Sequence, residues 1–172
     1  MSFGRIGARA ALRSIALAFA VVALWVVPAF GTAGGAGTET FTEHAHEVPL
    51  FSFPATNACT GEPGIFSAVA TNQVFHITKQ ASGEMWVTGT DEGVATFTPD
   101  NPSGVSASGH FTSWFGEALN QKSHVEHSTS TFVLKATDGS HITMHMKDHL
   151  STNAKGEVTS VFNTETARII CG

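Results

Sequence analysis

The 172-residue sequence has no tyrosine, only two cysteines, and few basic residues, with nine lysines and arginines against fourteen acidic residues. The absence of tyrosine excludes a tyrosine acid or nucleophile. Cys59 and Cys171 are too far apart in the sequence for a CxxC redox pair or a multi-cysteine zinc motif. Nucleophile elbows, P-loops, dinucleotide fingerprints, HExxH motifs and EF-hand loops are also missing. We therefore expect a binding protein rather than an enzyme of a common class.

The N-terminal segment has the pattern of a secretory signal peptide. Three arginines within the first 13 residues precede an apolar run over 15–27, and small residues follow at 31–36. The apolar run is shorter than the roughly 20 residues that a membrane anchor needs. Small residues at 31 and 33 predict cleavage after Ala33. We expect residues 1–33 to be removed and residues 34–172 to form a single secreted domain without a stable membrane anchor.

Removal of residues 1–33 would leave six basic residues against fourteen acidic ones, a net charge of −8 with neutral histidines. The remaining lysines and the one arginine are scattered singly, so the chain offers no basic stripe for phosphate groups. Nucleic acids and anionic membranes are therefore not expected partners. In an oxidising compartment the two cysteines predict one disulfide, Cys59–Cys171, which would close a long loop.

Apolar and polar residues alternate with period two along most of the chain, and almost no segment has helical period. This pattern predicts an all-β domain. The segment over 49–64, with several prolines and glycines, is expected to be irregular. The expected strands cover residues 38–48, 65–70, 72–79, 84–90, 93–98, 105–117, 123–137, 140–152 and 157–170.

Consecutive hairpins predict an antiparallel meander of about eight strands, which leaves two free edges unless the sheet closes. Cys59 follows the first expected strand and Cys171 ends the last one. A disulfide between them would hold the terminal strands together. We therefore expect a closed up-and-down barrel of lipocalin-like architecture, with a β-sandwich as the alternative.

The dipeptide Asp138-Gly139 predicts a two-residue type I′ hairpin. Its register would place His145 opposite Phe132 and His149 opposite Ser128. In the next hairpin the same histidines would lie beside Thr164 and Ser160.

Nine histidines are many for a domain of this size, and His141, His145 and His149 share one face of an expected strand. Two interpretations remain open. Either this face is solvated and the Ile/Met face is core, or the histidines point into the barrel lumen with His76 and Glu117 as companions. In the second case these side chains are ligand, metal or acid–base candidates, and zinc or copper are the metals that imidazoles suit.

Four short segments resemble a family of small secreted bacterial proteins. They are Cys59-Thr60-Gly61-Glu62-Pro63, Trp114-Phe115-Gly116-Glu117, Asp138-Gly139-Ser140 with the later His145 and His149, and the terminal Cys171-Gly172. The resemblance implies a secreted single domain with one disulfide, and it implies no activity.

Three functions are compatible with the sequence. The first is a secreted barrel that binds a small or apolar ligand in its lumen, by analogy with lipocalin-like carriers. The second is a histidine-dependent protein, either a metal-binding protein or a barrel isomerase or cyclase. The third is a cell-surface interaction module, which needs no lumen. No cofactor is required by the first or the third.

Overall fold

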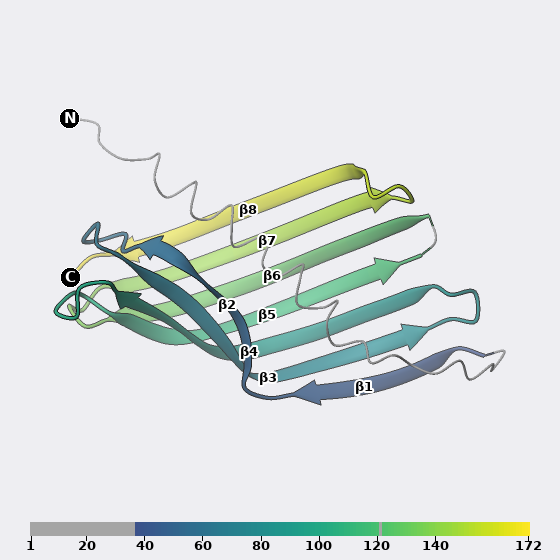
Figure 1. The fold of residues 1–172 in the computed structure, drawn as a ribbon, viewed down its shortest axis with the longest axis horizontal. Helices are drawn as coiled ribbons and strands as arrows, with labels where there is room; N and C mark the ends of the chain where they lie inside the picture. Colours follow the sequence, from purple (N-terminus) through teal and green to yellow (C-terminus); the bar gives the residue numbers. More distant parts are fainter. Residues whose placement is uncertain (1–36, 121) are drawn as a thin grey trace.

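The computed structural model describes residues 37–120 and 122–172 (Figure 1). The predicted signal peptide over 1–33 lies outside this part of the chain. A helix with the length and apolarity to cross a membrane is not found among the described residues.

All regular structure in the described residues is β-strand, and every paired strand is antiparallel to its neighbour. The all-β prediction is therefore confirmed. The eight strands are β1 (Glu39–Ala45), β2 (Val48–Thr56), β3 (Pro63–Lys79), β4 (Met85–Pro99), β5 (Ala107–Leu119), β6 (Ser123–Ala136), β7 (His141–Asn153) and β8 (Val158–Ile170).

The strands form one sheet in the order β1-β3-β4-β5-β6-β7-β8, and β2 also pairs with β3. β1 pairs with the second half of β3, whereas β2 pairs with its first half. The sheet therefore has β1 and β2 along one edge and β8 along the other (Figure 1). No ladder joins these edges in the described residues, so the meander is confirmed but the closed barrel is not. A sandwich would need a second sheet, and these strands form one.

β2 lies in the segment that we expected to be irregular, and that prediction was wrong. Pro49 and Pro54 argued against a strand because proline cannot donate to a β-ladder. Proline is tolerated at a sheet edge, where one side of the strand needs no partner, and β2 is an edge strand. Some of the expected strands also merge. The runs over 65–70 and 72–79 form β3, which has a bulge between Ala70 and Asn72.

The predicted register of the β6–β7 hairpin was wrong by one residue. His145 lies opposite Thr131, and His149 lies opposite His127. The cause is the loop. Ala136 N donates to Ser140 O at 2.8 Å and Gly139 N donates to Ala136 O at 3.1 Å, so the loop has three residues rather than two. Side chains alternate between the two faces of a sheet. A one-residue change of register therefore places each β7 side chain on the opposite face from the β6 residue that was predicted to lie beside it.

Three hairpins share this loop geometry. Gly83, Gly139 and Gly156 each occupy the third loop position, with φ of 86°, 91° and 76°. In each loop the glycine N donates to the carbonyl oxygen three residues earlier. The left-handed conformation at this position strains residues with a side chain, which explains the glycine in all three loops.

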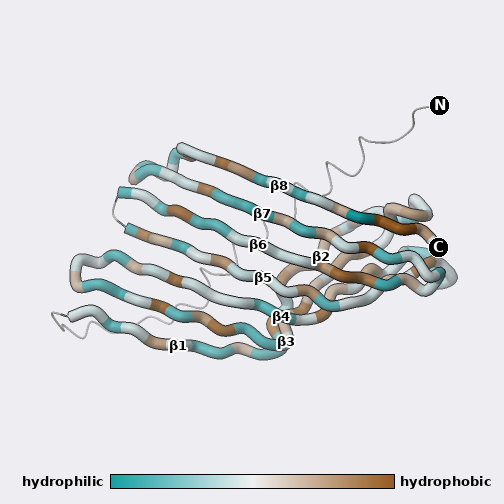
Figure 2. Tube along the Cα trace, turned by 180° about the vertical axis from the view of Figure 1, so that it is seen from behind, coloured by the Kyte–Doolittle hydropathy of each residue, from teal (hydrophilic) through white to brown (hydrophobic). Residues whose placement is uncertain are grey.

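The main apolar core lies between β2 and the face of the sheet over which β2 crosses, which we call the inner face. Phe51 of β2 packs against Phe66 and Phe132, with ring centroids 5.7 and 6.4 Å apart. Phe132 also stacks on Phe111 at 5.5 Å, and both rings are fully buried. Apolar residues accordingly concentrate toward the end of the sheet where the C-terminus lies (Figure 2).

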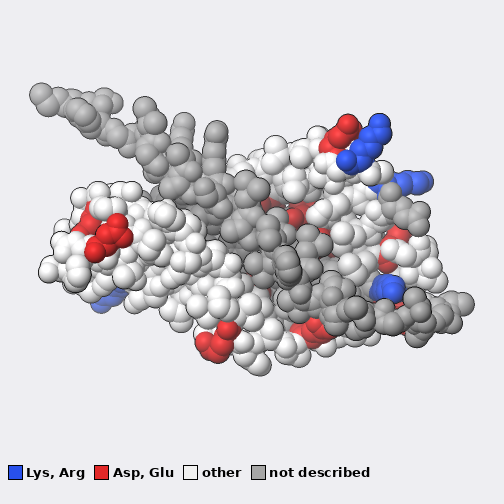
Figure 3. Space-filling view, viewed as in Figure 1, with Lys and Arg blue, Asp and Glu red and all other residues white. Residues whose placement is uncertain are grey.

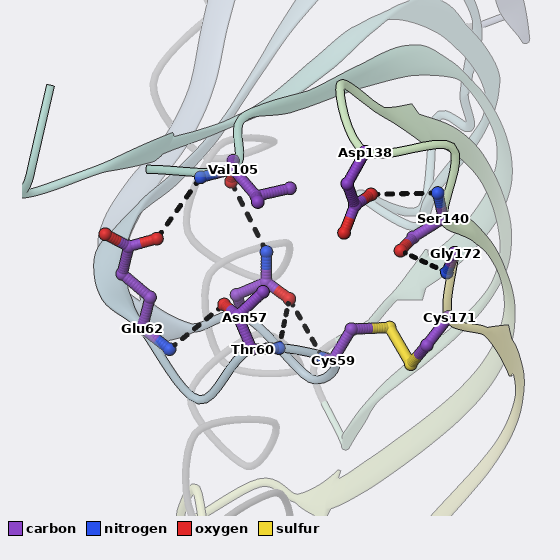
Figure 4. The surroundings of a disulfide bond; sticks show 9 residues. All are labelled: Asn57, Cys59, Thr60, Glu62, Val105, Asp138, Ser140, Cys171 and Gly172. Carbon is purple, nitrogen blue, oxygen red and sulfur yellow. Dashed lines mark hydrogen bonds between the residues drawn. A yellow bond between two sulfur atoms is a disulfide. The ribbon is translucent and has the colours of Figure 1, made fainter. Parts of the chain in front are cut away.

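The predicted disulfide is confirmed. Cys59 in the β2–β3 turn is bonded to Cys171 after β8, with Cα atoms 5.5 Å apart (Figure 4). Gly172 N donates to Ser140 Oγ at 2.9 Å, which attaches the C-terminus to the β6–β7 loop. The two edges of the sheet are therefore joined at one end by a covalent bond, although no β-ladder closes them.

Polar side chains hold the turn that carries Cys59. Asn57 Oδ1 accepts from Cys59 N at 2.9 Å and from Thr60 N at 3.2 Å, while its Nδ2 donates to Val105 O at 3.3 Å. Glu62 Oε2 accepts from Val105 N at 3.2 Å. These bonds connect the turn to the segment before β5, so the disulfide is attached to a fixed part of the sheet (Figure 4).

Candidate ligand-binding site on the inner face

Two apolar clusters occupy the inner face. The first is the β2-covered core around Phe132. The second lies toward β1 and contains Phe75, Ile77 and Val87, with Phe41, Met85 and Phe115 packed against them. Strand alternation explains why both clusters lie on one face, since their members occupy alternate positions along each strand. Polar residues lie between these clusters.

A row of polar side chains crosses four strands between the clusters. Gln73, Asp91, Ser113 and Ser130 are consecutive cross-strand partners on β3, β4, β5 and β6. Each is only 2–5% exposed. Gln73 Nε2 donates to Asp91 Oδ1 at 2.9 Å, and Ser130 Oγ donates to Ser113 Oγ at 3.0 Å. We call these four residues the polar row.

Asp91 is the one ionisable member of the polar row. Burial raises the pKa of its carboxyl group to about 6, and the hydrogen bond from Gln73 partly opposes this shift. Desolvation has this effect because it disfavours the charged form. A carboxyl group with this pKa changes protonation close to neutral pH, as groups at functional sites often do.

Further carboxyl groups lie beside the polar row on β5 to β8. Burial raises the pKa of Glu126, and the nearby Glu117 and Asp148 raise it further, while His124 lowers it. Burial also raises the pKa of Asp148, opposed by a hydrogen bond from Asn163. Desolvation raises the pKa of Glu165 on the exposed strand β8. The inner face thus gathers carboxyl groups whose charged forms are poorly solvated or mutually repelling.

Glu117 and His124 form the closest charged contact of this group. His124 Nε2 lies 2.7 Å from Glu117 Oε1, and Glu117 is the more deeply buried of the two. The hydrogen-bond geometry at His124 Nε2 is poor, so this nitrogen has no aligned partner among the described residues. The contact is therefore an ion pair when the imidazole is protonated, and a weaker dipolar contact otherwise.

No lysine or arginine of β4 to β8 shares the inner face. Lys135, Lys147 and Arg168 belong to the opposite, outer face, because their cross-strand partners alternate with the buried residues. In the view of Figure 3, some acidic groups lie near the middle of the molecule, and most of the visible basic groups lie nearer its outline. The part of the inner face that the structure describes on these strands is therefore acidic.

The structure does not bring the four sequence-predicted candidates together. His76 and His145 are exposed on the outer face, where His76 Nδ1 lies 3.0 Å from Thr42 Oγ1 and His145 Nδ1 lies 3.0 Å from Thr131 Oγ1. Glu117 is buried on the inner face. The histidines of β7 therefore do not point into a lumen, as one interpretation of the sequence expected. Met144 and Met146 occupy the buried face of this strand.

Among the described residues, His149 is the only candidate histidine whose ring contacts another imidazole. Its ring stacks on His127 at 6.4 Å, and His127 in turn packs against Trp114 at 5.2 Å. Within the described residues, no three or more His, Cys, Asp or Glu side chains are arranged to hold a metal ion.

The polar row was not predicted from the sequence, where the histidines were the candidate site residues instead. Once the inner face of each strand is known, Gln73, Asp91, Ser113 and Ser130 fall at positions where the strand alternation requires core residues. A polar residue at a core position breaks the local pattern, and such breaks concentrate at functional sites.

Comparison of the chain with protein-family models, with curated proteins and with solved structures finds no match to any of them.

Proposed function

We propose that this is a secreted binding protein that holds a small amphipathic ligand with a cationic group on the inner face of its sheet. The observation that carries the proposal is the polar row, which is buried between two apolar clusters. Burying polar groups costs free energy that an all-apolar core would avoid. Binding of a ligand that contacts both the apolar clusters and the polar row would explain why polar residues occupy these buried positions.

The charge of the inner face supports a cationic ligand. Asp91, Glu126 and Asp148 all have raised pKa values, and each would be relieved by a nearby positive charge. An anionic ligand, such as a fatty acid, would meet repulsion without a compensating lysine or arginine on this face of β4 to β8. Ligand sites in proteins combine apolar walls with a few placed polar groups, and the inner face offers both kinds of group.

The export of the protein is part of the proposal. The signal-peptide pattern over 1–33 supports it, and so does the Cys59–Cys171 disulfide, because disulfides persist in oxidising compartments. The edges of the sheet are joined at one end only, which leaves the far part of the inner face as the route for a ligand to enter.

The test compares two amphiphiles of equal chain length by isothermal titration calorimetry, decylammonium chloride and sodium decanoate. We expect decylammonium to bind with a Kd of about a millimolar or tighter and decanoate to bind at least tenfold more weakly. The Asp91→Asn and Glu126→Gln variants should each weaken decylammonium binding severalfold at pH 7.5.

Glu92→Gln is the matched control, because Glu92 adjoins Asp91 in the sequence but is exposed on the outer face. Its affinity for decylammonium should equal that of the parent. Equal binding of both amphiphiles, binding of neither, or an equal loss in the Glu92→Gln variant would overturn the proposal.

A further inference from the structure

The outer face carries a second feature that the proposed function does not use. An open groove of about 420 Å³ lies across β4, β5 and β6. This volume falls within the range of small-molecule sites, roughly 300–1,000 Å³. Six of the residues that line it belong to the outer face: Thr90, Glu92, Thr112, Trp114, Thr129 and Thr131. Asp91 and Ser113, whose side chains belong to the polar row, also line it.

Trp114 gives the groove an exposed aromatic surface. Its side chain is 41% exposed although it packs against His127. A single exposed aromatic residue is common, whereas a contiguous exposed aromatic surface marks an interaction site. Tryptophan is enriched at interfaces because its ring is apolar and its N–H is polar.

The aromatic surface continues beyond the groove. Trp114 on β5, His127 on β6 and His149 on β7 pack ring against ring, with centroids 5.2 and 6.4 Å apart. Phe162 on β8 is the cross-strand partner of His149 and is 56% exposed. We call these four residues the ring row. With one ring on each of four adjacent strands about 4.8 Å apart, the row suits an extended chain of flat units.

The polar groups of the groove are hydroxyls rather than a cluster of one charge. Thr90, Thr112 and Thr129 make no side-chain hydrogen bond within the part of the chain that the structure describes, so their hydroxyls are available as donors and acceptors. Glu92 accepts from Asn72 Nδ2 at 3.3 Å, and Lys147 lies opposite Thr129. One carboxylate and one ammonium group favour neither an anionic nor a cationic polymer.

We infer that the groove and the ring row bind a neutral polysaccharide. The face of a pyranose ring presents apolar C–H groups that stack on an aromatic ring, while its rim presents hydroxyls that pair with threonine and carboxylate oxygens. The groove supplies both kinds of contact, and the ring row extends the stacking surface in one direction, as a linear glycan requires. The side chains that would contact the glycan lie on the opposite face of the sheet from those of the polar row, although Asp91 and Ser113 of that row also line the groove.

The test uses the full exported protein with hexasaccharides of β-1,4-linked glucose, β-1,4-linked N-acetylglucosamine and α-1,4-linked glucose, measured by calorimetry. Insoluble cellulose, chitin and peptidoglycan are used in a sedimentation assay. At least one of these glycans should bind with a Kd of about a millimolar or tighter. Trp114→Ala should weaken that binding at least tenfold, and Trp114→Phe, which keeps a ring, should weaken it less.

Trp86→Ala is the matched control, because Trp86 is 55% exposed on the same face of β4 but does not line the groove. It should change the affinity less than twofold. Circular dichroism and thermal unfolding of each variant establish that it is folded, and Thr112→Val provides a second groove variant that leaves the ring row intact. The inference is overturned if no glycan binds, or if Trp86→Ala and Trp114→Ala reduce binding equally.

Discussion

Gln73 donates a hydrogen bond of 2.9 Å to Asp91 across β3 and β4, with both side chains almost completely removed from solvent. This single hydrogen bond does not offset the free-energy cost of burying the charged carboxylate, because the pKa of Asp91 remains raised from 3.8 to about 6. The pair is therefore a site where protonation and folding are linked.

The first prediction concerns the pH dependence of stability. Because the pKa of Asp91 is higher in the folded state, the folded protein binds more protons than the unfolded chain between about pH 4 and pH 6. The contribution of Asp91 is fully favourable below its unfolded pKa and is lost as pH rises through about 6. The loss amounts to roughly 3 kcal/mol, since one pKa unit corresponds to about 1.4 kcal/mol.

Asp91→Asn should therefore stabilise the protein at pH 8 relative to the parent and have little effect at pH 4. Urea unfolding at both pH values measures the difference, and Glu92→Gln, on the exposed face, serves as the control. A difference between Asp91→Asn and parent that is the same at pH 4 and pH 8 would contradict the linkage.

The second prediction compares two phenylalanines. Phe132 is fully buried among Phe51, Phe66 and Phe111, whereas Phe162 is 56% exposed on β8. Phe132→Ala removes buried apolar surface and leaves a cavity, so it should reduce the free energy of unfolding by about 3–5 kcal/mol. Phe162→Ala should change it by less than about 1 kcal/mol. Equal losses in chemical unfolding would show that the core is not under β2.

The third prediction concerns the disulfide. Cys59→Ala should destabilise the protein by about 2–5 kcal/mol, because the cross-link restricts the unfolded chain over a sequence separation of 112 residues. The Cys59→Ala/Cys171→Ala double variant should lose no more than about 1 kcal/mol beyond the single variant, since both changes remove the same bond. Dithiothreitol should lower the stability of the parent and leave that of the double variant unchanged. Additive losses in the double variant would argue against this pairing.

The fourth prediction tests the close approach of β3 and β4. A Cβ atom added at Gly93 would lie 2.0 Å from the carbonyl oxygen of Val69 and 2.8 Å from Ala70 Cα. Both neighbours are backbone atoms, so the strands would have to separate. Gly93→Ala should cost about 1–3 kcal/mol in thermal or chemical unfolding. Gly37→Ala, where nothing lies within 4 Å, should be close to neutral. A neutral Gly93→Ala would mean that the strands are further apart than described.

Strand content was predictable from the sequence because alternation is a local property, and the hairpins that follow β6 and β7 were located by Asp138-Gly139 and Asn153 to Gly156. The register was not predictable with the same accuracy. A glycine in a left-handed conformation serves both two-residue and three-residue loops, and only the hydrogen bonds of Ala136 distinguish them. That one-residue error gave His145 and His149 the wrong partners on β6. Their partners on β8 are Thr166 and Phe162, so the prediction of Thr164 and Ser160 was also wrong.

The orientation of β7 could not be derived from its own residues, since Ile142, Met144 and Met146 alternate with His141, His145 and His149 on either interpretation. It is decided by β2, whose phenylalanines cover the Met face and form the main core. β2 itself was not predicted, because its two prolines argued against a strand. The polar row was missed for a related reason, since the inner side of β4 became identifiable only when its neighbours in the sheet were known.

The Cys59–Cys171 bond makes the chain from the β2–β3 turn to the end of β8 a covalent ring. Each hairpin loop from β3 onward belongs to that ring. A protease that cuts one such loop opens the ring without releasing a fragment, so the cleaved protein runs as one piece on a non-reducing gel and separates into two only after reduction. A single cut in one of these loops therefore leaves all the strands of the acidic inner face covalently attached to one another.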